Sequence, residues 1–111
     1  MVNGVYAYTA STKIYVFAAT DNGLSISTDD GATFTNYTTS NGLGSNTVNG
    51  VSPGFSTPSS TTVLVATNKG LSTTTTKNIG KFTNYTTDNG LGSNKVNGVY
   101  QQSSTIYAAT G

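Results

Sequence analysis

The stretch "TNYTTSNGLGSNTVNGV" occupies residues 35–51, and a second version of it, "TNYTTDNGLGSNKVNGV", occupies residues 83–99. The two versions differ at only two positions, and the VNGV that ends both of them also begins at Val2. The three VNGV segments start 46 and 48 residues apart. A repeat of this length accommodates four short strands and is too long for one turn of a β-helix. The duplication therefore indicates a chain built from repeated β units.

Each unit divides into four predicted strands, because β-branched and aromatic residues are separated by turn-forming ones. Asn-Gly pairs, which tolerate positive φ, predict tight reversals, and they begin at Asn3, Asn22, Asn41, Asn49, Asn89 and Asn97. Because Pro53 has no amide hydrogen to donate, we expect the strand around it to be broken or bulged. By position within the unit, the predicted strands are residues 5–9, 51–55 and 99–103; 13–20, 62–67 and 105–110; 23–28 and 70–76; and 33–39 and 81–87.

Two complete units and half of a third fit the chain, as residues 1–47, 48–95 and 96–111. The half unit has only the first two strands, so its edge is open to pairing with another chain. We therefore predict an all-β protein whose four-stranded antiparallel sheets are blades of a β-propeller. The ring would be completed by a homo-oligomer, since closure needs at least four blades. Two chains hold enough strands for five blades if their half units combine into a hybrid blade. The alternative is a flatter repeat sandwich or solenoid whose open edges form filaments.

The residue types that are missing exclude several classes of function. The chain has neither Cys nor His, its five basic residues are all lysines, and its four acidic residues are all aspartates. We therefore expect no disulfide, no metal site, no cofactor and no enzyme activity, because the usual nucleophiles and proton shuttles are lacking. The net charge of +1 argues against nucleic acid or an anionic membrane as a partner. No apolar run is long enough to span a membrane, and residues 1–10 lack the features of a signal peptide.

The segment "STDDGATF", residues 27–34, resembles the Asp-box of sialidase-type propellers. The match is complete at Ser27, Asp29, Gly31, Thr33 and Phe34. The resemblance implies a hairpin in which the Asp accepts backbone hydrogen bonds and the aromatic residue packs between blades. The second version, residues 75–82, keeps only the aromatic residue in place. An Asx-type turn explains the Asp without any ligand, and sialidase activity is excluded because the chain has no Arg and no Glu.

A longer pattern covers most of the chain. It comprises the repeated NGLGSN and VNGV, the AT that ends each second strand, and the later GLS and YTT. The pattern resembles the blades of sensor propellers in two-component regulators, and also the nearly identical blade arrays of bacterial surface proteins. The resemblance implies a periplasmic or extracellular module that senses or binds a ligand and does not catalyse a reaction.

Because strands alternate in direction, the loops after the second and fourth strands lie at one end of each unit. Ring-shaped folds bind ligands at such loop faces. The residues predicted to contact a ligand, with glycans as the favoured class, are Asp21, Asn22, Asn46, Asn68, Lys69 and Asn94. The alternative is that they are turn formers with solvated side chains. Tyr37 and Tyr85 present ring faces either to a sugar or to a neighbouring blade.

The sequence thus predicts a non-catalytic repeat module that assembles with copies of itself and presents repeated, shallow ligand sites. The alternative is a structural protein, or an engineered propeller fragment, whose only activity is assembly.

Overall fold

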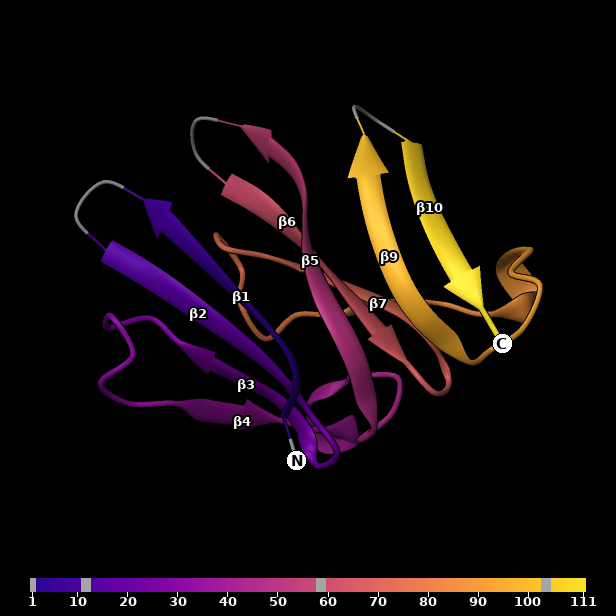
Figure 1. Ribbon diagram of the computed structural model, residues 1–111, viewed down its shortest axis with the longest axis horizontal. Helices are drawn as coiled ribbons and strands as arrows, with labels where there is room; N and C mark the ends of the chain where they lie inside the picture. Colours follow the sequence, from indigo (N-terminus) through magenta and orange to yellow (C-terminus); the bar gives the residue numbers. More distant parts are fainter. Residues whose placement is uncertain (1, 11–12, 58–59, 103–104) are drawn as a thin grey trace.

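A computed structural model describes residues 2–10, 13–57, 60–102 and 105–111. Strands make up most of these ranges, which contain no α-helix. Figure 1 shows three antiparallel sheets arranged side by side. The first sheet consists of β1 (Val2–Ala10), β2 (Lys13–Thr20), β3 (Gly23–Ser27) and β4 (Thr35–Tyr37). The second consists of β5 (Val48–Thr57), β6 (Ser60–Thr67), β7 (Gly70–Thr75) and β8 (Thr83–Tyr85). The third consists of β9 (Val96–Gln102) and β10 (Thr105–Thr110).

The chain runs back and forth through each sheet, in the strand orders β1-β2-β3-β4 and β5-β6-β7-β8. In the part of the chain that the structure describes, the third sheet has two strands, which pair only with each other. β5 contacts both β1 and β9, and these three strands point the same way in Figure 1. The predicted all-β class with four-stranded antiparallel sheets is therefore confirmed.

The first strand of each sheet begins earlier than the sequence predicted. β1, β5 and β9 include the VNG segment, so the prediction of tight reversals at Asn3, Asn49 and Asn97 was wrong. Each asparagine is instead passed over by the pairing register, because its two neighbours pair with consecutive residues of the partner strand. The extra residue of a β-bulge is re-aimed out of the ladder. The repeated Asn-Gly therefore bends three strands in the same way.

The other three Asn-Gly pairs do form turns. Gly23, Gly42 and Gly90 have φ values of 113°, 98° and 102°, which favour glycine. A Cβ on Gly23 would also overlap the Tyr37 carbonyl oxygen. The irregularity predicted around Pro53 is confirmed, since the register of β5 shifts between Pro53 and Ser56.

The fourth strands are shorter than predicted, with three residues each in β4 and β8. Each is followed by a 3₁₀ turn, η1 (Thr39–Asn41) or η2 (Thr87–Asn89). Thr38 and Asn41 form a capping box around η1, and the same pair of residue types caps η2. The side chains satisfy the backbone groups that would otherwise extend the strand. The duplicated stretch is therefore a capped turn that leads from one sheet to the next.

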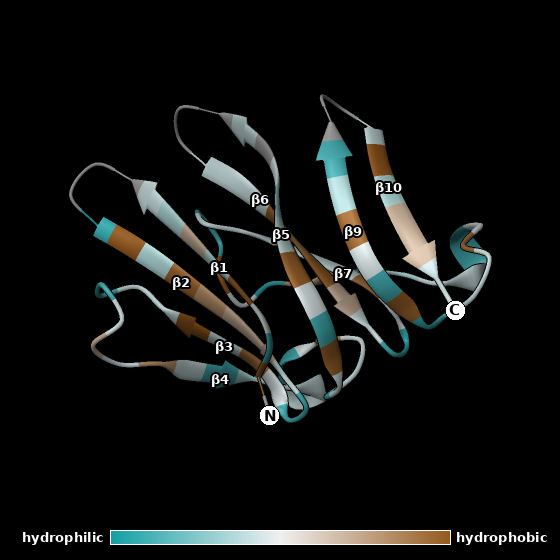
Figure 2. Cartoon of the chain, viewed as in Figure 1, coloured by the Kyte–Doolittle hydropathy of each residue, from teal (hydrophilic) through white to brown (hydrophobic). Residues whose placement is uncertain are grey.

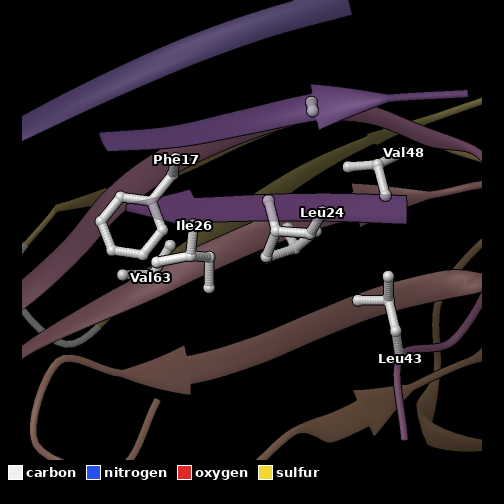
Figure 3. Close-up of a cluster of buried hydrophobic side chains, with 8 residues drawn as sticks. Phe17, Leu24, Ile26, Leu43, Val48 and Val63 are labelled. Atoms are coloured by element: carbon white, nitrogen blue, oxygen red, sulfur yellow. The ribbon is translucent and has the colours of Figure 1, made fainter. Parts of the chain in front are cut away.

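Two apolar clusters lie between the sheets. The first lies between the first and second sheets, and all of its members are at most 3% exposed: Phe17, Ala19, Leu24, Ile26, Leu43, Val48, Val63 and Val65. Figure 3 shows side chains from both sheets meeting there, with Leu43 arriving from the connecting loop. Apolar segments of β2 and β3, which contribute to this cluster, stand out in Figure 2. The second cluster is smaller and joins the second and third sheets through Leu64, Ala66, Leu71 and Val96.

Candidate functional site

The loops after the second and fourth strands meet at one end of the sheets. The amide of Gly23 donates to the carbonyl of Asn46 (2.6 Å), and the amide of Asn68 donates to the carbonyl of Thr47 (3.2 Å). The six residues predicted to contact a ligand belong to these loops, and all six are exposed. Their hydrogen bonds, however, give them different roles.

Two asparagines that the ligand prediction left out join neighbouring sheets at this end. Asn3 Nδ2 donates to the carbonyl at the start of β5 (2.7 Å) and to Asp21 Oδ1 (2.9 Å). Asn49 Nδ2 donates in the same way to the carbonyl at the start of β9 (2.9 Å) and to Asn68 Oδ1 (2.9 Å). Asp21 and Asn68 therefore each hold the asparagine that bridges two sheets. The sequence signal was the VNGV repeat itself, which the prediction assigned to turns.

Asn46 and Asn94 stabilise the loops to which they belong. Asn46 Oδ1 accepts from the Thr39 amide (2.9 Å), and Asn94 Oδ1 accepts from the Thr87 amide (2.8 Å). Each closes the capped 3₁₀ turn onto the following segment. These two side chains are committed to the loop fold through their oxygen atoms, which leaves their amide NH₂ groups for a ligand.

Asn22 and Lys69 are the predicted residues whose side chains make no hydrogen bond within the described ranges. Their backbone amides donate to the hydroxyl groups of Thr20 (3.0 Å) and Thr67 (3.1 Å). The threonine hydroxyl groups thus stabilise the two turns, while the side chains of Asn22 and Lys69 are exposed to solvent. The structure therefore presents one free amide and one free ammonium group at separate turns.

The hairpin between β3 and β4 is organised around Asp29. Its Oδ2 accepts from the Thr33 hydroxyl (2.5 Å), while its Oδ1 accepts from the Thr33 amide (2.9 Å) and the Ser27 hydroxyl (2.8 Å). The two bonds from Thr33, followed by that from Ser27, lower the pKa of Asp29 to about 2. Gly31 sits in the left-handed region with φ 90°. This geometry accounts for four of the five Asp-box positions as turn formers, while Phe34 is half exposed.

A hollow of about 420 Å³ opens beside β10, between the second and third sheets. Its lining includes Tyr85, Leu91, Ile106 and Ala108. None of the six residues predicted to contact a ligand lines it, whereas Tyr85, for which the sequence predicts either sugar stacking or packing between blades, does. Tyr85 is 38% exposed. The hollow therefore exposes an aromatic ring beside apolar side chains of the third sheet.

Two more surfaces expose large apolar side chains, at the outer ends of the row of sheets. Val2 and Val5 on β1 are exposed at one end, and Tyr100 and Tyr107 in the third sheet are exposed at the other. Isolated exposed apolar residues are common on monomers, but grouped ones mark interaction sites. These two ends are therefore candidate interaction surfaces.

The described residues contain no group of three or more acidic, His or Cys side chains that could hold a metal ion. No helix in the same part of the chain is suited to crossing a membrane. Comparisons of the chain with protein-family models, with curated proteins and with solved structures find no match.

Proposed function

We propose that the protein is a non-catalytic module that assembles head to tail with copies of itself, so that its sheets become blades of a closed β-propeller. One observation carries the proposal: the surfaces exposed at the two ends of the chain correspond to the two halves of the interface buried inside it. The absence of Cys, His, Arg and Glu from the sequence supports a role without catalysis.

The exposed face of the third sheet repeats a face that is buried in the first. Phe17 and Tyr107 both lie three residues before the AT threonine of their strand, yet Phe17 is 0% and Tyr107 is 55% exposed. Tyr6 stacks on Phe17 with ring centroids 5.9 Å apart, and Tyr100 stacks on Tyr107 at 6.3 Å. The second sheet covers the first pair. Tyr100 and Tyr107 form a stacked pair of the same kind, but no sheet packs over them in the described structure and both are exposed.

The opposite end presents residues that correspond to that cover. Val48 and Val51, at the first and fourth positions of VNGV, belong to or pack against the first apolar cluster. Val2 and Val5 hold the same positions in β1 and are 58% and 62% exposed. A second copy placed with its β1 next to β9 would thus set valines against Tyr100 and Tyr107, as β5 does inside the chain. Heterologous contacts of this kind generate rings when the rotation closes.

A polar contact is likewise formed between the sheets inside the chain and is missing at the third sheet. The side chains of Asn3 and Asn49 each donate to the carbonyl that begins the next sheet, whereas the side chain of Asn97 makes no hydrogen bond within the described ranges. A neighbouring copy would offer Asn97 the carbonyl of its own Val2. The proposal therefore predicts both the apolar and the polar part of the contact.

Native mass spectrometry and light scattering test the proposal directly. We expect a discrete oligomer for the wild-type chain and a monomer for both Val5→Lys and Tyr107→Lys, because each variant buries a charge at one end. Ser40→Lys, in an exposed loop, is the matched control and should assemble normally. A wild-type protein that stays monomeric at 100 μM (a concentration about a hundredfold above a micromolar Kd) would contradict the proposal, and polydisperse filaments would favour open-edge growth.

Mixing the two variants separates head-to-tail assembly from a symmetric contact. Val5→Lys retains an intact third-sheet face, and Tyr107→Lys retains an intact β1 face. The mixture should therefore form a heterodimer through one intact interface and should not grow further. Dimerisation of Val5→Lys on its own would instead show that two third-sheet faces meet.

A second candidate function is glycan binding at the loop end. It is supported by the two Asn-bridged junctions, which place exposed polar groups at repeated positions, including Asn22 and Lys69. Repetition around a ring would raise the avidity of individually weak sites. A glycan array probed with wild-type protein and with monomeric Val5→Lys tests this function, and signals at background level for both would refute it.

A further inference from the structure

We propose that the hollow beside β10 is a binding site for a β-hairpin that has the sequence chemistry of the third and fourth strands of this repeat. The site is distinct from the two end surfaces and does not depend on their assembly. Its structural reference is the junction between the first and second sheets, where the hairpin β7–β8 occupies the corresponding place.

The backbone of β10 offers the first element of the site. β2 and β6 each pair on one side with the first strand of their sheet and on the other side with β3 or β7. Among the described strands, β10 pairs with β9 alone. A strand edge with unpaired amides and carbonyls is a template for β-augmentation. By the register of β6 and β7, the incoming strand would place its Gly opposite Thr110 and its Ser opposite Ala108.

The side chains of β10 that face the hollow correspond to buried residues in the second sheet. Ile106 occupies the position of Val63, and Ala108 occupies that of Val65, counted back from the AT threonine. Val63 and Val65 are completely buried, whereas Ile106 is 39% exposed. The difference marks apolar surface that a hairpin would cover.

Three polar groups around the hollow lack the partners that their counterparts have. The hydroxyl groups of Thr20 and Thr67 donate to the glycine carbonyl that opens the next strand (2.7 Å in both cases). Thr110 corresponds to them, and its hydroxyl group makes no hydrogen bond in the described structure. The carbonyl oxygen of a hairpin glycine would satisfy it.

The loop that lines the hollow also contains backbone groups without the partners that their counterparts have. In the first junction, the Gly44 amide donates to Ser72 Oγ (3.1 Å), and Asn84 Nδ2 donates to the Gly42 carbonyl (2.9 Å). The corresponding groups in the second junction are the Gly92 amide and the Gly90 carbonyl, and neither has a partner among the described residues. A hairpin with Ser after Gly-Leu and Asn before Tyr would supply both.

An aromatic contact completes the match. Tyr37 packs edge-on against Phe82 of the β7–β8 hairpin, with ring centroids 5.9 Å apart and planes at 68°. Tyr85 corresponds to Tyr37, lines the hollow and is exposed. The occupant therefore needs a Phe two residues before its Asn. These requirements together specify a hairpin with Gly-Leu-Ser in one strand and Phe-x-Asn-Tyr in the other.

A synthetic peptide with the sequence of residues 23–39, GLSISTDDGATFTNYTT, contains every required residue and its own tight turn. Fluorescence anisotropy of the labelled peptide is measured against full-length Val5→Lys, so that self-assembly does not interfere. We expect saturable binding, together with slower hydrogen exchange at the β10 amides. Peptides carrying Ser25→Ala with Asn36→Ala, or Phe34→Ala, should bind at least about tenfold more weakly, since about 1.4 kcal/mol corresponds to tenfold.

On the protein side, Ile106→Lys in the Val5→Lys background should abolish peptide binding, while circular dichroism reports whether the sheets persist. If that variant unfolds, the peptide variants still test the site. Equal affinity for a scrambled peptide, or no binding at millimolar concentration, would overturn the inference. Binding of a simple sugar in the hollow, without binding of the peptide, would also overturn it, in favour of a glycan site. A monomeric wild-type chain would contradict the assembly proposal and leave this result unaffected.

Discussion

At the scale of single residues, the asparagine of VNGV bridges two sheets at Asn3 and Asn49, whereas the side chain of Asn97 has no such partner. Asn49 bridges the second and third sheets by donating to the carbonyl of Val96, a residue that is 0% exposed. Asn97 holds the same position in β9 and is exposed. The pair separates the contribution of the bridge to folding from its contribution to assembly.

We expect Asn49→Ala to lower the free energy of unfolding by about 1–2 kcal/mol, because the carbonyl at the start of β9 loses its donor. Asn97→Ala should change the stability of the monomeric Val5→Lys protein by less than about 0.5 kcal/mol. In the wild-type background, Asn97→Ala should instead weaken the oligomer. Urea denaturation and native mass spectrometry measure the two effects. A loss of monomer stability from Asn97→Ala equal to that from Asn49→Ala would contradict the assignment.

The Asp29 turn predicts a dependence of stability on acid. The pKa of Asp29 is lowered from its ordinary value of 3.8 to about 2 in the folded protein, so between these values the unfolded chain binds more protons. The stabilisation from this carboxylate is therefore fully present above about pH 4 and is lost as the pH falls through about 2. Asp29→Asn should be less stable than wild type at pH 7, and the difference should shrink towards pH 2 in urea titrations. A difference that is constant with pH would show that ionisation of Asp29 does not contribute.

At the scale of elements, the turn between the second and third strands depends on a glycine conformation. Gly70 has φ 122°, and a Cβ on it would overlap the Tyr85 carbonyl oxygen. We expect Gly70→Ala to cost at least about 1–3 kcal/mol, from the backbone conformation alone. Gly98→Ala is the matched control, because no atom lies within 4 Å of the added Cβ. Thermal denaturation followed by circular dichroism compares them, and equal melting temperatures would contradict the role given to this turn.

The strands could be predicted from the sequence more completely than their ends. β2 and β10 match their predicted ranges, because Lys13 and Thr105 open continuous apolar segments with clear turn signals behind them. The Asn-Gly of VNGV was assigned to turns because local preference cannot distinguish a hairpin from a bulge. That choice depends on the neighbouring sheet, which offers Asn3 a carbonyl only after the chain has folded.

The candidate sites were less predictable, because they are defined by contacts between units. Composition identified Asp21 and Asn68 as polar loop residues, and only the structure shows that each is paired with a bridging asparagine. The hollow at β10 combines Tyr85, Leu91 and Ile106, which are distant in the sequence. Aligning the repeats could have signalled it, since the apolar lining residues Leu71, Ile106 and Ala108 correspond to Leu24, Val63 and Val65, which are buried one unit earlier.

At the scale of the whole molecule, the repeat places equal surfaces in unequal surroundings. The same positions form a buried cluster at the first junction, a smaller cluster beside an open hollow at the second, and exposed surface at both ends. Repeat units bury their faces against neighbours, so the outer units are the least stabilised. A copy docked at each end would give the outer sheets the environment that the second sheet already has.

We therefore expect the melting temperature of the wild-type chain to rise with protein concentration. Association that requires the folded chain adds about 1.4 kcal/mol for each tenfold rise above Kd, which corresponds to roughly 5 °C for a domain of this size. The melting temperature of Val5→Lys should not change with protein concentration, and neither should that of Tyr107→Lys. Because the end surfaces are apolar and the net charge is only +1, raising the salt concentration should not reduce the shift. Scanning calorimetry from 5 to 500 μM (about two decades around a micromolar Kd) measures it. A wild-type melting temperature that does not change with concentration would mean that the two ends do not meet.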